Sequence, residues 1–263
     1  MVAAKKPIGE ITHGTTNPNR LRRVDRYIVT LPIVRKPGCV LVDLGFGATP
    51  VTAVELLARV RKVNPSARMV GIEIDRERVQ NAKPLEAPGL EFLLGGFETP
   101  LPAGVNQADL IRAFNVLRQY DEAEVADAWK LMCSRLSETG NLIEGTCDEI
   151  GRVSSWITLD RSGPQSFTIV LRLTGLELPS KVAERLPKAL IHRNVAGERI
   201  HAFLTDLDRA WLANAGVGAL SAVQRWVATC EAMIAGGWPV KVDRKRWRLG
   251  ELTVDWDAVR PGS

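Results

Sequence analysis

An apolar run that ends in a Gly-x-Gly turn places the strongest constraint on how this chain can fold. Residues 39–44 are apolar except for Asp43, and Gly45-Phe46-Gly47 follows directly. A second mostly apolar run, 69–74, comes one helix length later and is followed by acidic Asp75. Strands separated by a helical segment pair in parallel, so the two runs predict neighbouring strands of a parallel sheet with both turns at one edge.

The residues at this edge suit a nucleoside. Glycines let the backbone approach a ligand closely, and a carboxylate at the tip of the next strand, here Glu73, can accept hydrogen bonds from both ribose hydroxyls. A dinucleotide site also needs a third glycine for close helix–strand packing, and Pro50 stands at that position. The pattern therefore disfavours an NAD-dependent oxidoreductase.

Four motifs in order, within residues 39–147, resemble those of class I S-adenosylmethionine (SAM)-dependent methyltransferases. The Asp43-Leu-Gly-x-Gly sequence resembles their first motif, and Glu73 stands at the end of the second strand. Residues 90–97 look like the third strand and its adenine loop, and 108–117 resemble the fourth-strand motif in the Asn-Val-Leu form of receptor-glutamate methyltransferases. The resemblance implies SAM as the cofactor and transfer of its methyl group to an acceptor.

The resemblance also implies which residues surround the cofactor. The glycine turn would wrap the methionine part, Asp43 would support the amino group through the loop or a water, and Glu73 would hold the ribose. Gly96 stands where the family usually has Asp, so adenine N6 needs another acceptor, such as backbone, and Phe97 would supply an apolar wall. The implied cofactor residues are Asp43, Gly45, Phe46, Gly47, Glu73, Ile74, Gly96, Phe97, Ala113, Phe114 and Asn115.

The first 38 residues form a basic leader. They hold eight Lys or Arg against two acidic residues, a net charge of +6, while the whole chain carries +5. Leu21, Val24 and Ile28 recur at helical spacing and predict a short amphipathic helix. We expect the leader to pack over the cofactor mouth and to engage phosphates, an acidic substrate or the cofactor carboxylate, unless it is a solvated arm. The candidate anion or substrate residues are Arg20, Arg23 and, from the fourth motif, Arg112.

The coarse reading of the chain predicts an α/β fold with a doubly wound, mostly parallel, seven-stranded sheet and an antiparallel strand near one edge. The predicted strands are 39–44, 68–74, 90–95, 108–114, 141–146, 153–159 and 166–173. Alternation over 153–159 predicts a meander with the strands on either side of it, in place of the crossover helix usual in the family. Asp121 and Glu124 form a capping box for a helix to about Leu136, which Thr139-Gly140 ends.

Beyond residue 179 the pattern becomes mainly helical. Apolar periodicity predicts helices near 198–213 and 218–235, and a last strand is expected at 251–256. We therefore divide the chain into a leader (1–38), a SAM-binding core (39–178) and a C-terminal subdomain packed on the core (179–263).

The acceptor and any catalytic base are harder to predict, because in-line methyl transfer needs little more than alignment of donor and acceptor. Candidate bases near the sheet edge are Glu144, Asp148, Glu149 and Tyr120, with His192 as a further one, and each has a simpler structural explanation. No His/Cys/Asp cluster suggests a metal, and no signal or membrane-spanning segment is visible, so we expect a cytoplasmic protein. We favour methyl transfer to a small-molecule or lipid-like acceptor. The alternative is methylation of RNA, and the second alternative is a protein that binds SAM without turnover.

Overall fold

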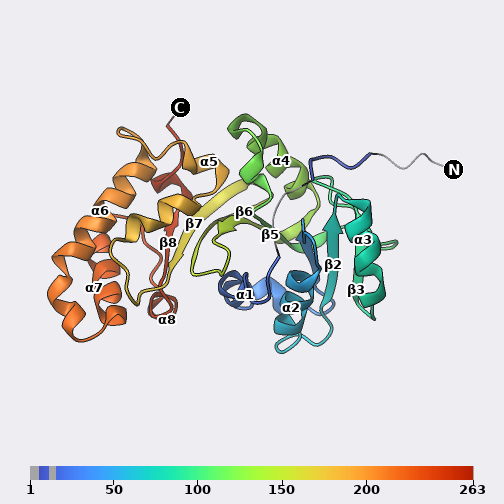
Figure 1. Ribbon diagram of the computed structural model, residues 1–263, viewed down its shortest axis with the longest axis horizontal. Coiled ribbons are helices and arrows are strands. Elements are labelled where there is room, and N and C mark those ends of the chain that lie inside the picture. Colours follow the sequence, from blue (N-terminus) through green and yellow to red (C-terminus); the bar gives the residue numbers. More distant parts are fainter. Residues whose placement is uncertain (1–5, 12–15, 263) are drawn as a thin grey trace. The chain divides into compact units, whose positions relative to one another are not determined.

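The computed structural model describes residues 6–11 and 16–262, and its strands form a sheet with the order β3-β2-β1-β4-β5-β6-β7-β8 (Figure 1). Strands β1 to β4 are paired in parallel, so the strand order reverses between β1 and β4. The strands are β1 Val40–Leu44, β2 Arg68–Glu73, β3 Leu90–Leu94, β4 Ala108–Phe114, β5 Leu136–Cys147, β6 Val153–Asp160, β7 Gly163–Leu171 and β8 Glu251–Asp255.

Helices connect these strands and extend beyond them. The α-helices are α1 Arg22–Ile28, α2 Val51–Val60, α3 Arg76–Ala82, α4 Glu122–Ser134, α5 Lys188–Ile191, α6 Arg199–Ala213, α7 Ala222–Ala235 and α8 Arg244–Trp247. Short 3-10 helices are η1 Pro32–Arg35, η2 Lys83–Leu85, η3 Leu117–Gln119, η4 Pro179–Arg185, η5 Ala215–Ala219 and η6 Trp256–Ala258.

Two compact units divide the chain, and each has its own core. The first comprises the residues up to Glu144 together with Glu149–Gly151 and Leu159–Gly163. The second comprises Gly145–Asp148, Arg152–Thr158 and the residues from Pro164 onward. The domain bounds predicted from the sequence, 1–38, 39–178 and 179–263, stay a proposal.

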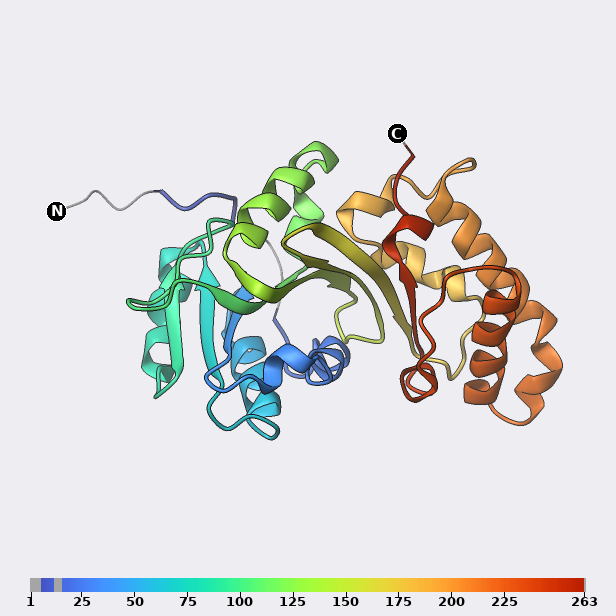
Figure 2. The same cartoon turned by 180° about the vertical axis from the view of Figure 1, so that it is seen from behind.

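The core of the first unit is built on strands that are buried on both faces. Every residue of β1 and β4 is buried, as expected for central strands of a parallel sheet that helices cover on either side. Helix α2 contacts β1 and β2 through an apolar face that includes Leu56 and Val60. Helix α1 lies beside α2 in both views (Figures 1 and 2), with Val24 and Ile28 buried, which confirms the short helix predicted for the leader.

The second unit is held together largely by aromatic side chains. Helices α6 and α7 pack side by side (Figure 2). The rings of Trp211 and Trp226 meet edge to face with their centroids 6.2 Å apart, and the guanidinium of Arg225 lies 3.7 Å from the centroid of the Trp211 ring. Both tryptophans are almost fully buried, so apolar burial and a cation–π contact together fix the helix pair.

The meander predicted after the fifth strand is confirmed. Residues 153–160 form β6, which lies between β5 and β7 in the sheet, and the connections on its two sides are too short to hold a crossover helix. The sheet has eight strands and not seven, because the strand predicted at 251–256 pairs with β7 through Val170↔Glu251 and its neighbours.

The predicted helix ends are confirmed where side chains cap them and wrong where they do not. Asp75 accepts backbone hydrogen bonds at the start of α3, and the Asp121–Glu124 capping box opens α4. Thr139-Gly140 does not end α4, which stops at Ser134. Residue 135 already pairs with the first residue of β4 (Ala108 N to Arg135 O, 2.8 Å), so β5 begins earlier than its sequence indicates.

Within the part of the chain that the structure describes, no helix is both long and apolar enough to cross a bilayer. Over the same residues, no group of three or more His, Cys, Asp or Glu side chains is placed to hold a metal ion.

Candidate functional site

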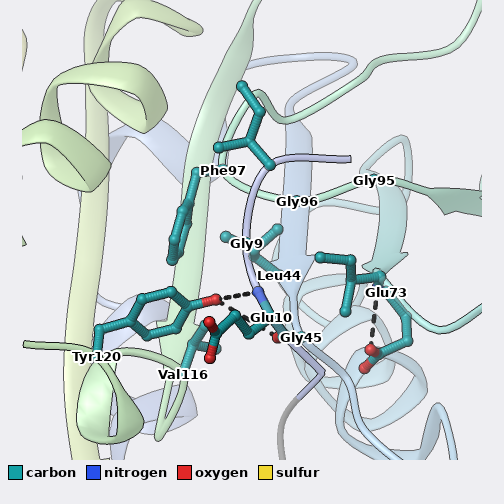
Figure 3. Close-up of a pocket in the computed structure, with 12 residues that line it drawn as sticks. Gly9, Glu10, Leu44, Gly45, Glu73, Gly95, Gly96, Phe97, Val116 and Tyr120 are labelled. Carbon is teal, nitrogen blue, oxygen red and sulfur yellow. Dashed lines mark hydrogen bonds between the residues drawn. The ribbon is translucent and has the colours of Figure 1, made fainter. Parts of the chain in front are cut away.

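A pocket opens at the carboxyl ends of β1, β2, β3 and β4 (Figure 3). This is where the strand order reverses, and open parallel sheets bind ligands in the crevice that such a reversal leaves. The position of the pocket alone therefore makes it the first candidate for a ligand site. It is lined by Ile8, Gly9, Glu10, Leu44, Gly45, Glu73, Ile74, Gly95, Gly96, Phe97, Val116 and Tyr120.

In the glycine turn after β1, Gly45 lines the pocket and Gly47 does not, and both have a conformation that only glycine adopts readily. Gly45 and Gly47 have φ of +73° and +80°, in the left-handed region. A Cβ on Gly45 would also lie 2.7 Å from Cγ2 of Val116, which follows β4. Both glycines are thus required by local geometry, as the sequence predicted for a close backbone approach.

Glu73 stands at the tip of β2 with its carboxylate held by backbone amides. Its Oε2 accepts a hydrogen bond from Gly47 N at 2.8 Å, and its Oε1 accepts from Ile74 N at 2.9 Å and Asp75 N at 3.2 Å. A carboxylate offers about four acceptor positions. These contacts leave about one for a ligand, so a second ribose hydroxyl could bond only if an amide were released.

Asp43 and Arg112 turn away from the pocket and pair with each other in the core. The Arg112 Nε lies 2.9 Å from one carboxylate oxygen of Asp43, and its other nitrogens reach Asp25 and the Thr52 carbonyl. Asp43 also accepts from the Thr52 hydroxyl at 2.7 Å. Burial lowers the pKa of the Arg112 guanidinium, but the two aspartates outweigh this and keep its pKa above the usual value.

This arrangement corrects the role expected of Arg112. Its side chain is fully buried, and its carboxylate partners are Asp25 of α1 and Asp43 of β1. An arginine with these contacts holds the leader helix to the sheet and does not present a charge to a substrate. Asp43 is likewise absent from the pocket lining, so support of the cofactor amino group by Asp43 stays a prediction.

Residues 8–10 lie at the pocket and contribute to its lining (Figure 3). Ile8 donates its N–H to Glu98 Oε2 at 2.8 Å and accepts from Phe97 N at 2.9 Å. The Tyr120 hydroxyl accepts a short hydrogen bond from Glu10 N, and the rings of Phe97 and Tyr120 lie 5.1 Å apart between their centroids. Part of the leader therefore lies over the pocket. The basic residue Lys5 lies outside the described residues.

Other residues predicted for the cofactor fall into two groups. Ile74, Gly96 and Phe97 line the pocket. The rest are not among its lining residues: Phe46 is buried edge to face against Phe92, Ala113 and Phe114 are buried in β4, and Asn115 follows them with φ of +60°.

Arg20 and Arg23 are half-buried, just before and within α1. Neither lines the pocket, so their role toward an anion stays a prediction.

Of the candidate bases, only Tyr120 lines the pocket, and burial raises its pKa. Glu144 is fully buried in β5, and desolvation raises the pKa of its carboxyl to about 8. Asp148 accepts a hydrogen bond from Arg152 N at 2.7 Å, while Glu149 and His192 are exposed. The geometry thus singles out Tyr120 as the candidate that a ligand in the pocket could reach.

Sequence reasoning missed several lining residues. Leu44, Gly95 and Val116 each adjoin a residue that was predicted, so extending every motif by one position would have found them. Ile8, Gly9 and Glu10 carry no such signal, because their place depends on contacts with residues about ninety or more positions later.

Comparisons with known proteins give likenesses of structure alone. No protein-family model matches the chain, and no curated protein matches it. Similar solved structures include a chain of the complex between the Haloferax volcanii Trm112 methyltransferase activator and the putative methyltransferase, at 21% identity and a TM-score of 0.37, covering 48% of this chain and 52% of that one. They also include human N-acetylserotonin methyltransferase in complex with SAM, at 22% identity and a TM-score of 0.36, covering 49% and 35%. The chain therefore spans about half or less of the length of these structures, and the assignment of the site rests on its own geometry.

Proposed function

We propose that this protein binds SAM in the pocket at the carboxyl ends of β1–β4 and transfers its methyl group to an acceptor. The observation that carries the proposal is that the pocket brings together three separate sequence motifs, at Gly45, Glu73 and Gly96-Phe97, at the reversal point of a parallel sheet. No one of these motifs is specific by itself, but their convergence on one pocket is.

The residues present fit a nucleoside that carries an amino acid. A carboxylate at the tip of β2 suits a ribose hydroxyl, and Phe97, Ile74 and Val116 offer apolar walls for a base. The left-handed glycines bring backbone close to the pocket floor without side chains. When bound, SAM would supply a methyl group on a positively charged sulfur.

The chain's own groups would bind and orient the reactants. Glu73 would accept from one ribose hydroxyl, and the glycine turn would hold the amino acid end. Tyr120 would position an acceptor by a hydrogen bond from its phenolic O–H, because Tyr120 lines the pocket. We propose a small molecule as the acceptor, since the apolar side chains of Ile8, Ile74 and Val116 are among those that line the pocket.

RNA is the second candidate, favoured by Arg22 and Arg26, which are exposed on α1. If two arginines of the leader each neutralise a phosphate, the affinity for single-stranded RNA should fall with salt at a log–log slope of about 1.4.

Calorimetry with SAM, its demethylated product S-adenosylhomocysteine and NAD tests the binding step. Glu73→Ala should weaken both methyl-cycle ligands about ten- to hundredfold, because a charged hydrogen bond contributes roughly 1.5–3 kcal/mol. Asp75→Ala is the matched control: it removes a carboxylate two residues away that caps α3 and does not line the pocket. The proposal would be contradicted if the Glu73→Ala variant bound SAM as tightly as the unaltered chain does. Tighter binding of NAD than of SAM by the unaltered chain would also contradict it.

Incubation with methyl-labelled SAM and fractionated cell extract tests the transfer step. Label in the small-molecule fraction is the expected result, and label in RNA would select the alternative acceptor. Binding of SAM without label in any fraction would show a SAM-binding protein without turnover.

A further inference from the structure

The N-terminal strap, residues 6–11, is hydrogen-bonded through Ile8 to the loop that follows β3. Ile8 presents both its backbone N–H donor and its backbone C=O acceptor to the loop after β3. The donor reaches Glu98 Oε2 at 2.8 Å, and the acceptor receives Phe97 N at 2.9 Å. The other oxygen of the same carboxylate, Oε1, accepts from Gly96 N at 2.9 Å, so the carboxylate is fixed in place.

An adenine edge presents the same pair of groups, a donor and an acceptor, as the backbone of Ile8. Its amino N–H is a donor, and the neighbouring ring nitrogen is an acceptor. The Glu98 carboxylate and the Phe97 N–H are therefore complementary to adenine as well as to Ile8. Both lie in the loop whose residues Gly95, Gly96 and Phe97 line the pocket, so an adenine base and the strap would meet the same partners.

Gly96 shows that this loop is shaped to receive the strap. A Cβ at this position would overlap the carbonyl oxygen of Ile8, so any other residue would push the strap away. Further contacts hold the strap: among them, Glu10 N donates to the Tyr120 hydroxyl, and Gln119 Nε2 donates to the Ile11 carbonyl oxygen at 3.2 Å.

We propose that the strap and the adenine base of SAM compete for one recognition pair, the Glu98 carboxylate and the Phe97 backbone N–H. The strap then regulates access to the pocket, since the base binds only when Ile8 has left. This inference rests on the proposed function. Glu98 then accepts the hydrogen bond of the adenine amino group, a role that Gly96 cannot fill because it has no side chain.

Calorimetry with S-adenosylhomocysteine tests the competition, with two substitutions at one residue. Ile8→Pro removes the N–H that Glu98 accepts, whereas Ile8→Ala keeps the peptide and shortens a side chain that is 46% exposed. Freeing a site that is mostly closed raises apparent affinity by the inverse of its open fraction, so Ile8→Pro and deletion of residues 1–11 should tighten binding about tenfold or more. Ile8→Ala should stay within about twofold of the unaltered chain.

Hydrogen exchange of the full-length, unaltered protein supplies a second reading. Adding S-adenosylhomocysteine should speed exchange of the Ile8 and Glu10 amides, because both lose their acceptors when the strap leaves. Slower exchange, or weaker binding after deletion, would make the strap a wall of the pocket and overturn the competition. Equal affinity in all variants would overturn it while leaving SAM binding intact. Absence of binding in every variant, the deletion included, would instead refute the proposed function and the competition with it.

Discussion

Replacing Glu144 with glutamine should make the stability of the protein less dependent on pH. The carboxyl of Glu144 is buried in β5, and desolvation raises its pKa from 4.5 to about 8, with the Trp129 indole offsetting part of the shift. Because this carboxyl has a higher pKa in the folded than in the unfolded chain, its contribution to stability is fully present below pH 4.5, the unfolded pKa. The contribution is lost as the pH rises toward 8, because the unfolded chain ionises Glu144 first.

The size of the effect follows from the width of this window. Each pH unit within it costs the folded state about 1.4 kcal/mol, so between about pH 5 and about pH 8 the unaltered protein should lose about 4 kcal/mol through Glu144 alone. Glutamine has the same shape and does not ionise. The Glu144→Gln variant should therefore match the unaltered protein near pH 5 and exceed its stability by about 2–4 kcal/mol near pH 8.

Urea unfolding of both proteins at several pH values measures the difference directly. Taking the difference cancels the contributions of the other titrating groups. Glu138→Gln is the matched control, because it makes the same chemical change on the same strand at an exposed position. A Glu144→Gln difference that stays flat from about pH 5 to about pH 8 would show that this carboxyl is already ionised in the fold and would refute the reasoning.

Two further substitutions test the contacts behind the pocket. Arg112→Met should destabilise the fold by about 3–5 kcal/mol in urea unfolding, because Asp25 and Asp43 lose the buried cation that they share and, among the described residues, only Asp25 keeps a second one, Arg59 at 2.8 Å. A cost below about 1 kcal/mol would show that the ion pairs of Arg112 do not hold α1 in place. Gly45→Ala should cost about 1–2 kcal/mol from its left-handed backbone alone, with more from the Cβ that would lie 2.7 Å from Val116. Adding Val116→Ala should restore the second part only, and full restoration in thermal unfolding would mean that the backbone at residue 45 is unstrained.

The sequence was sufficient wherever structure depends on neighbours along the chain. The carboxyl ends of β1 to β4, the glycine turn and the Asp75 cap were predicted because each is set by periodicity, by φ or by hydrogen bonds over a few residues. The convergence of Gly45 and Glu73 at one sheet edge also followed, since parallel strands bring their carboxyl ends together.

Tertiary packing decided what lies between distant segments. Arg112 looks like an anion-binding residue until Asp25, 87 positions earlier, is placed against it in the core. The end of α4 depends on a backbone pairing with β4. A buried charge pairs with the nearest partner that the fold supplies, and a strand begins where another strand offers unpaired amides. Neither can be predicted from the local sequence pattern.

The strap shows the same limit at the site itself. Ile8 and Glu98 are 90 positions apart, and nothing in either segment marks them as partners. The sequence could state that Gly96 lacks the expected carboxylate, and it indicated a leader over the cofactor mouth. Only the fold shows the reason for that glycine: the Ile8 carbonyl occupies the space a Cβ would need, and the carboxylate of Glu98 faces the same peptide.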